Sequence, residues 1–439
     1  MGNIYTYLNN AWLNLQKETK DYPVFLGILL ALWAIPLSYA LNNVALGILL
    51  LLAIRFGKKQ AFVANPALYF PLALFALMAL SFTWTADSSG TARALSKGVS
   101  LLLFPILFLF YPVKHRLPKI LKGYAYGVLI YAVFCLLKAV IRFYLTSNST
   151  VFFYHELVTE DVNAIHVSVY VSLALFIFVK ELTTSRITWL FLAILAVFLV
   201  LLSSKNILVV ALVLGAVSVF KTIKHRWNSK SLWLGIGAII LVLALFSGKI
   251  LQRFQIEWES NVAEKSINTE LSTASQNVYN VSVNQAWNQA VFSANDYFPG
   301  TAFRVYQIRI FLELLQEDSL FFSGYGLNAT DAKIAQKQVE HQLYPDYGHK
   351  NFHNEYIQLF AELGIFGLLF LLALLFINTR NAFRTKDFAH ISFAVLMISL
   401  FLTESFLSRQ RGIVFFTLMY CLFNSANALN ASAEAKPNL

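Results

Sequence analysis

Apolar segments follow one another along nearly the whole chain, from Val24 to Phe423, with short polar stretches between them. A helix needs about 20 mostly apolar residues to cross a membrane, and shorter helices occur inside bundles. The 439 residues are 58% hydrophobic and only 13% charged, whereas soluble domains average about 25% charged residues. The sequence therefore predicts an all-α fold, a polytopic transmembrane helix bundle.

Twelve spans are expected, with both chain termini on one side of the membrane. They lie near residues 23–40, 43–56, 66–83, 94–112, 122–141, 166–180, 187–204, 206–220, 231–247, 355–378, 388–403 and 412–427. One long polar segment interrupts this series. The expected organisation is spans one to nine in residues 1–247, a loop subdomain in 248–352, and spans ten to twelve with a tail in 353–439.

The net charge of +11 is distributed unevenly between the two sides of the expected bundle. If the termini are cytoplasmic, 19 of the 34 basic residues fall in cytoplasmic loops and tails, and 7 lie in the short outer loops or at outer helix ends. Short cytoplasmic loops are typically rich in Lys and Arg. The long loop is thus expected to face the periplasm or the cell exterior. The excess of basic residues therefore indicates how the chain is oriented in the membrane, and it does not indicate a nucleic-acid partner.

The long loop has the pattern of a folded, mostly helical lid. One amphipathic helix is predicted over residues 303–316, with Val305, Ile308, Phe311, Leu312 and Leu315 on its apolar face. A second helix is predicted to run to about Gln342, with Asn328 or Thr330 as its cap.

A polar stripe begins the span that follows the loop. Asn354, Gln358 and Glu362 are spaced i, i+4, i+8, so they share one face of a helix that is otherwise apolar, and His353 and Glu355 lie at its start. A histidine exchanges protons near neutral pH, and polar groups in a membrane are costly unless they are paired or used. One interpretation is therefore a catalytic site. The alternative is an interfacial histidine that caps the loop and packs on its neighbours.

Basic residues near the outer face are candidates for binding an anionic group. Arg304 and Arg309 lie on the predicted loop helix, and arginine suits phosphate because of its planar fork of donors. The alternative for each is a solvated helix face. Lys205 lies between two spans. Either it is a turn lysine whose side chain extends to water, or it is a ligand for an anionic head group. Glu404 is expected to neutralise Lys205 or an arginine of the Arg409-Gln-Arg411 segment.

Several common motifs are absent from the sequence. It contains no phosphate-cradling G-x-x-x-x-G-K-[ST] loop, no H-E-x-x-H helix, no Cys/His set with metal-ligand spacing and no Asp-x-Asp pair. Neither a dedicated metal nor another cofactor is expected, and neither is a soluble nucleotide-sugar donor.

The segment from Phe352-His-Asn-Glu-Tyr-Ile-Gln358 through Glu362-Leu-Gly-Ile-Phe-Gly367 resembles the signature of the O-antigen ligase and polymerase superfamily. This family comprises lipopolysaccharide O-antigen ligases, O-antigen polymerases and O-linked protein oligosaccharyltransferases. Its members are inner-membrane proteins with about a dozen helices and one long periplasmic loop before the signature helix. The expected layout is similar across nearly the whole chain.

The resemblance assigns roles to individual residues. His353 is similar to the catalytic histidine of the family, and Arg304, within Gly300-Thr-Ala-Phe-Arg304, resembles the loop arginine that contacts the donor diphosphate. Family members often carry a second arginine at the outer end of a middle span. Lys205 is the nearest counterpart here, and it keeps the charge but lacks the bidentate fork.

The family's chemistry implies a glycan donor on a polyprenyl diphosphate and an acceptor hydroxyl. The expected activity is metal-independent, inverting transfer by an enzyme of the cell inner membrane whose active site faces the periplasm. Arg304, with Lys205 and Arg309, would hold the diphosphate, His353 would take the acceptor proton, and Glu355 or Glu362 would orient His353. A ligase would use lipid A-core as acceptor, a polymerase a second polyprenyl-linked glycan, and an oligosaccharyltransferase a protein hydroxyl. The ligase is favoured.

Two alternatives come from other functional classes. A membrane transporter would line a pathway with polar helix positions, but such proteins tend to contain paired broken helices in two related halves, and no such symmetry is visible in the sequence. A non-catalytic scaffold of an envelope complex would tolerate loss of both His353 and Arg304.

Overall fold

The computed structural model describes most of the chain. The described residues are 13, 16–56, 62–159, 162–180, 187–226, 258–259, 261–262, 266–268, 271–273 and 275–434. The expected ninth span, residues 231–247, lies outside them. All other expected spans coincide with helices whose ends differ from the expected limits by up to seven residues, and the span expected at 94–112 is divided between two helices, Ser88–Gly98 and Ser100–Phe110.

Helices make up nearly all of the described secondary structure, which confirms the expected helical fold. They are α2 (Phe25–Ala34), α3 (Tyr39–Phe56), α4 (Pro66–Leu80), α5 (Ser88–Gly98), α6 (Ser100–Phe110), α7 (Leu117–Thr146), α8 (Tyr154–Leu157), α9 (Ala164–Val179), α10 (Ile187–Leu201), α11 (Lys205–Arg226), α13 (Val283–Asn288), α14 (Gly300–Glu317), α15 (Asp331–Glu340), α16 (Glu355–Thr385), α17 (Phe388–Phe401) and α18 (Gln410–Glu434). Three two-residue strands, β1 (Ser266–Ile267), β2 (Tyr279–Asn280) and β3 (Asp296–Tyr297), form a small sheet in the long loop, in which β2 pairs antiparallel with β1 and parallel with β3.

Many of these helices have the length and composition of membrane spans. Within the described residues, five helical segments are long and apolar enough to cross a membrane: Tyr39–Phe56, Pro66–Thr83, Ser88–Phe110, Leu117–Thr146 and Glu355–Thr385. Shorter apolar helices accompany them at Phe25–Ala34, Ala164–Val179, Ile187–Leu201, Lys205–Ser218 and Phe388–Phe401. The chain is therefore a membrane protein. The total of twelve spans and the side that the loop faces stay predictions.

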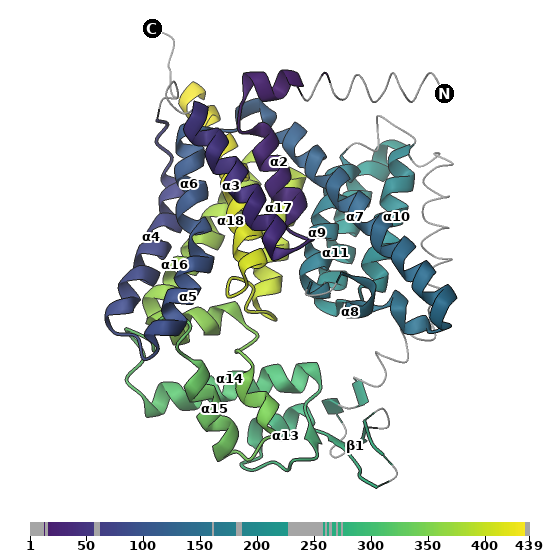
Figure 1. Cartoon of the computed structure of the whole chain (residues 1–439), viewed down its shortest axis with the longest axis vertical. Helices are drawn as coiled ribbons and strands as arrows, with labels where there is room; N and C mark the ends of the chain where they lie inside the picture. Colours follow the sequence, from purple (N-terminus) through teal and green to yellow (C-terminus); the bar gives the residue numbers. More distant parts are fainter. Residues whose placement is uncertain are drawn as a thin grey trace.

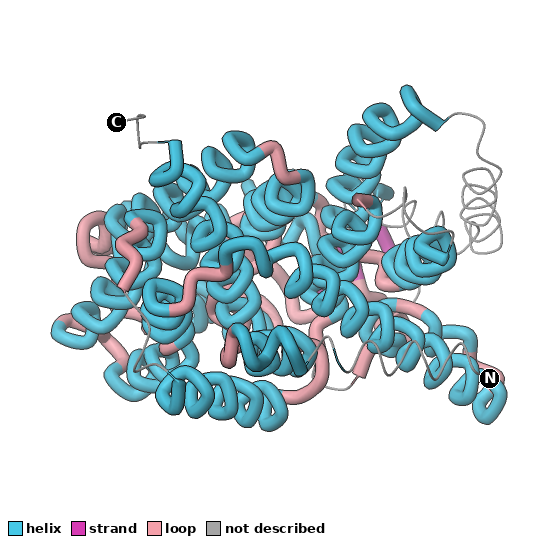
Figure 2. The backbone as a smooth tube through the Cα atoms, turned by 90° about the horizontal axis from the view of Figure 1, so that it is seen from above, coloured by secondary structure: helices cyan, strands magenta, loops and turns pink. Residues whose placement is uncertain are grey.

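The loop helices lie together at one end of the apolar bundle. Figure 1 shows α13, α14 and α15 below the bundle, and Figure 2 shows the bundle helices from above. Within the bundle, α7, α9 and α10 pack against one another, while α4, α6, α16 and α18 form a second group. Helix α17 packs against α9, α11 and α16 and so connects the two groups. The turn before α16 and the connection between α17 and α18 both face the loop helices.

The loop has a hydrophobic core of its own. Phe298, Phe303 and Tyr306 are central to it, and Phe352 and Ala361 join it from the turn before α16 and from α16 itself. Helix α14 confirms the amphipathic helix predicted over residues 303–316, and within its predicted apolar face Phe311 is buried while Val305 and Leu315 pack against the loop core. The buried residues are Ala302, Phe303, Tyr306, Gln307, Ile310, Phe311 and Leu314, and Leu312 is exposed. Tyr306 belongs to the buried face although it was not predicted there: its ring packs in the core, and its hydroxyl forms a hydrogen bond with His341 Nδ1 at 3.0 Å.

Helix α16 is broken at Gly364, which the apolar pattern did not predict. This residue has φ 64° and ψ −164°, and the loop backbone fills the resulting gap. Tyr325 N donates to Ala361 O at 2.9 Å, Gly326 N donates to Glu362 O at 2.9 Å, and Ile365 N donates to Phe321 O at 2.8 Å. The segment 321–326 therefore satisfies backbone groups that the break exposes. This contact fixes the loop over the first turns of α16.

A buried lysine stabilises the two long loop helices. Lys337 on α15 is 1% exposed, and its Nζ lies 2.6 Å from Glu317, 3.0 Å from Glu340 and 3.4 Å from Glu313. Burial lowers the pKa of Lys337, but these carboxylates raise it more, so the pKa rises above its ordinary value. The stabilising charge is thus fully present below pH 10.5 and is lost only as pH rises through the higher folded value.

We expect Lys337→Met to lower the free energy of unfolding of the loop by about 1–3 kcal/mol, because it leaves three carboxylates without their shared cation. The matched control is Lys333→Met on the same helix. Lys333 pairs with Asp318 at 2.7 Å in a half-exposed contact, so its loss should cost less than about 1 kcal/mol. Hydrogen exchange of the α14 and α15 amides measures both variants. Equal protection in the two would contradict the role given to Lys337.

Candidate active site

His353 occupies the turn immediately before α16. Its backbone has φ 48°, a left-handed conformation that is uncommon for a residue with a side chain. The backbone N–H donates to Asn351 Oδ1 at 3.1 Å, and the imidazole packs edge-on against Phe303 with ring centroids 5.7 Å apart. The side chain is 28% exposed. The turn thus holds a partly accessible imidazole between the loop helix α14 and the bundle.

Glu404 faces His353 from the connection between α17 and α18. Its Oε2 lies 3.6 Å from His353 Nδ1, which is an ion-pair distance when the imidazole is protonated. Its Oε1 accepts a hydrogen bond of 2.9 Å from Arg304 Nη2. The carboxylate is 10% exposed. Glu404 therefore bridges the two residues that the sequence singled out as base and phosphate ligand.

Arg304 is positioned by α14 and by the connection between α17 and α18. Its Nε donates to the Thr403 carbonyl at 2.8 Å, and its Nη1 donates to the Gly300 carbonyl at 2.9 Å. With the bond to Glu404, each nitrogen of the guanidinium has a protein acceptor. The side chain remains 30% exposed, so an anion can reach it from the aqueous side. Glu404 is its anionic partner within the described residues.

The charge of Glu404 is maintained by its neighbours. Burial raises its pKa, but contacts with His353 and the charge of Arg304 outweigh burial, so the pKa falls below the ordinary value of 4.5. The carboxylate is ionised at neutral pH. Its stabilising contribution is present above pH 4.5 and is lost as pH falls through the lower folded value.

The polar stripe of α16 holds the surroundings of His353 in place. Asn354 caps the helix by accepting from Ile357 N at 3.2 Å, and it donates to Leu402 O at 3.3 Å. Glu355 Oε2 accepts from Leu407 N at 2.7 Å. Gln358 donates to Glu362 Oε1 at 2.6 Å and accepts from Phe352 N at 3.2 Å. These contacts fix the turn and the connection between α17 and α18, and the carboxylate that faces His353 is Glu404.

The other candidate basic residues are placed differently. Arg309 pairs with Glu313 at 2.8 Å and donates to Gln289 O at 2.6 Å, so it is held within the loop and is not brought to Glu404. Lys205 begins α11. The next residue, Asn206, donates to Ser399 O at 2.8 Å and to Thr403 Oγ1 at 3.0 Å. The first turn of α11 therefore lies beside Thr403, whose carbonyl binds Arg304.

Two further histidines, His155 and His166, lie near enough to Glu404 to interact with its charge. His166, near the start of α9, packs edge-on against Phe406 with ring centroids 4.5 Å apart. Partial desolvation lowers the pKa of His155 on α8, while a backbone hydrogen bond with Val162 and the charges of Glu404 and Glu156 act in the opposite direction. Glu156, next to His155, pairs with Arg142 at 2.6 Å in a solvent-exposed contact.

The Glu404 partnership could not be read from spacing, because Arg304, His353 and Glu404 come from three separate segments. The sequence predicted Lys205, Arg409 or Arg411 as the basic partner of Glu404. Among the described residues, the arginine that forms an ion pair with Glu404 is Arg304. Among the described residues there is no group of three or more His, Cys, Asp or Glu side chains arranged to hold a metal.

Comparison with known families places most of this site within one domain. Residues 169–372 match the family model described as O-antigen ligase. The match includes Lys205, Arg304 and His353 and ends before Glu404. It confirms the family resemblance of the sequence. No curated protein matches the chain.

Proposed function

The chain carries a domain of the O-antigen ligase family over residues 169–372, and from this premise we propose that it transfers a glycan from a polyprenyl diphosphate to a hydroxyl of lipid A-core. The proposed location is the periplasmic face of the cell inner membrane. The observation that carries the proposal is the linked arrangement of Arg304, Glu404 and His353, which joins a phosphate ligand to a base through one carboxylate.

The proposed reaction is a single displacement. The acceptor hydroxyl oxygen attacks the anomeric carbon of the donor sugar, and the bond from that carbon to the diphosphate oxygen breaks. The diphosphate leaves with the electron pair, and the hydroxyl proton passes to Nε2 of His353, since Nδ1 faces Glu404. Glu404 stabilises the imidazolium that forms. The anomeric configuration inverts, and the reaction needs no nucleotide because the diphosphate is already a good leaving group.

Donor binding is coupled to the base through Glu404. In the structure the carboxylate forms a short contact with Arg304, at 2.9 Å, and a longer contact with His353, at 3.6 Å. A diphosphate at Arg304 replaces Glu404 as the anionic partner of the guanidinium. The carboxylate then pairs with His353 alone, so that donor binding and the position of the base are linked through Glu404.

We expect Glu404→Gln to tighten donor binding while lowering the turnover number by about 10-fold to 100-fold, because the amide neither competes for Arg304 nor stabilises the imidazolium. The matched control is Glu156→Gln, which removes an exposed ion pair with Arg142 and should change neither quantity. Steady-state kinetics with varied donor concentration separates the two effects. A Glu404→Gln variant with weaker donor binding and unchanged turnover would overturn this role.

The acceptor is tested by offering each candidate to the purified protein with one polyprenyl diphosphate glycan. Transfer to lipid A-core supports the ligase that we propose. Growth of longer polyprenyl-linked chains would identify a polymerase, and labelling of a protein hydroxyl would identify an O-linked oligosaccharyltransferase. The same arrangement of Arg304, Glu404 and His353 serves all three, because it acts on the shared donor.

A further inference from the structure

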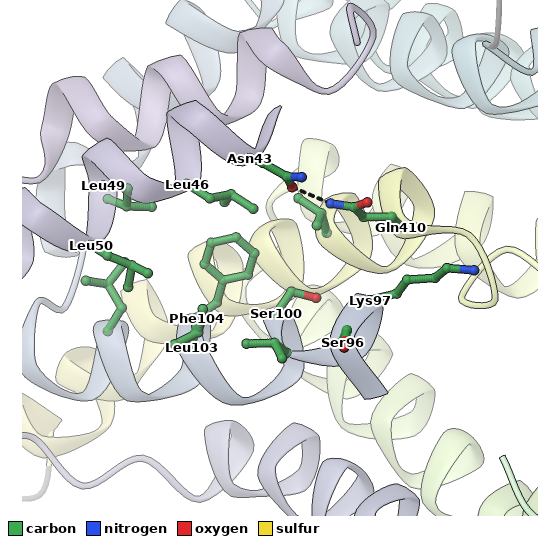
Figure 3. A pocket seen from close by; sticks show the side chains of 13 residues that line it. Asn43, Leu46, Leu49, Leu50, Ser96, Lys97, Ser100, Leu103, Phe104 and Gln410 are labelled. Carbon is green, nitrogen blue, oxygen red and sulfur yellow. Dashed lines mark hydrogen bonds between the residues drawn. The ribbon is translucent and has the colours of Figure 1, made fainter. Parts of the chain in front are cut away.

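An apolar cavity of about 260 Å³ lies between α3, α5, α6 and α18, away from the site described above. Figure 3 shows its walls, which include Leu46, Leu49 and Leu50 from α3 and Leu103 and Phe104 from α6. Neither Arg304, His353 nor Glu404 lines it. The cavity is therefore not part of the proposed transfer site.

One end of the cavity is polar and basic. Ser96 and Lys97 contribute from α5, and Gln410 from α18 donates to Asn43 Oδ1 of α3 at 2.5 Å. Figure 3 shows the Lys97 side chain extending away from the leucines of the opposite wall. Within the part of the chain that the structure describes, no carboxylate lies within ion-pair distance of Lys97, which is exposed.

The polar end is on the loop side of the bundle. Helix α5 contacts the loop through Thr91, whose hydroxyl donates to Leu327 O at 2.7 Å. Helix α18 begins at Gln410, directly after the connection that carries Glu404. The lining residues thus run from Lys97 and Gln410, on the loop side, to Leu50 and Leu107, further along α3 and α6.

Helix α3 also presents an apolar face to the outside of the bundle. Val44, Leu51 and Ile54 are 60%, 68% and 74% exposed. In a membrane this face contacts lipid chains, which places lipid beside the helix that forms one wall of the cavity. A hydrocarbon chain suits the leucine walls, and an anionic head group suits Lys97 at the rim.

We propose that this cavity is a binding site for an anionic phospholipid of the loop-side leaflet. One acyl chain lies between α3 and α6, and the phosphate lies at Lys97. Phospholipid is the occupant because the walls are apolar, because Lys97 places a positive charge at the rim, and because the candidate ligands of the donor diphosphate lie outside the cavity. The bound lipid would fill the space between α3 and α6 and stabilise their packing against α18.

The test uses native mass spectrometry of the purified full chain, delipidated and then titrated with phosphatidylglycerol, phosphatidylethanolamine or polyprenyl phosphate. Wild type should bind phosphatidylglycerol most tightly. Lys97→Gln should weaken that binding about five-fold, the effect expected for one basic residue at a membrane surface. Arg93→Gln is the matched control, because Arg93 lies one turn away on α5 and does not line the cavity. It should bind as wild type does.

A second variant tests the hydrocarbon part of the site. Leu103→Trp fills the cavity and should reduce binding of every lipid tested, while the unfolding temperature reports whether the variant is folded. Equal losses in Lys97→Gln and Arg93→Gln would overturn the assignment of the phosphate to Lys97. Unchanged binding in a folded Leu103→Trp would overturn the cavity as the site. Tighter binding of polyprenyl phosphate than of phosphatidylglycerol would assign the site to the donor lipid and overturn the phospholipid proposal.

Discussion

His353→Ala is expected to lower glycan transfer by about 10³-fold while leaving the protein folded. The imidazole is the group that we propose as general base, and it lies against Glu404 in a turn that α14 and α16 hold in place. Transfer from a polyprenyl diphosphate glycan to lipid A-core, measured with purified protein in detergent, gives the rate. The unfolding temperature of His353→Ala should match that of the wild-type protein.

Two further variants separate chemistry from folding. His349→Ala changes an exposed histidine four residues earlier and should transfer at the wild-type rate. His353→Gly should be as inactive as His353→Ala but more stable by about 1 kcal/mol, because glycine adopts φ 48° without strain. Full transfer by His353→Ala would remove the histidine from the mechanism.

Gly364→Ala is expected to destabilise the protein by about 3–5 kcal/mol and to release the loop from α16. A Cβ at this position would lie 2.2 Å from the Phe322 carbonyl oxygen, and the residue has φ 64°. The steric clash and the backbone strain would both weaken the three backbone hydrogen bonds that join residues 321–326 to the break in α16. Gly324 faces the same contact from the loop, where a Cβ would lie 2.4 Å from the Glu362 carbonyl carbon.

The measurement is hydrogen exchange at the Tyr325 and Gly326 amides, together with the unfolding temperature. Gly215→Ala is the matched control, because a Cβ there meets no atom within 4 Å and the residue lies within a helix. It should not destabilise the protein. Wild-type protection at Tyr325 and Gly326 in Gly364→Ala would show that the loop does not depend on the break.

Hydrophobicity and motif spacing were sufficient for much of this description. The apolar runs located the described apolar helices with ends correct to within seven residues, since segment length and composition determine which helices can cross a membrane. The loop helix and the candidate residues Arg304 and His353 were also identified from sequence. Their proximity across two segments is a tertiary property, and the family motif was needed to link them.

Other features depend on contacts that sequence patterns do not encode. The partner of His353 is Glu404, 51 residues further along, while the nearer Glu355 accepts a backbone hydrogen bond from Leu407. The break at Gly364 was not visible because a single glycine within an apolar run is compatible with a continuous helix. The gap is filled by loop backbone, which only the folded structure brings there.

The most direct test of the account measures release of polyprenyl diphosphate from a purified polyprenyl-diphosphate glycan, with lipid A-core present and no nucleotide added. We predict that wild-type protein releases one polyprenyl diphosphate for each glycan transferred, and that His353→Gln releases about 10³-fold less. The proposed mechanism would be contradicted if His353→Gln released polyprenyl diphosphate at the wild-type rate. The proposed activity would be contradicted if folded wild-type protein released none with any of the three acceptors.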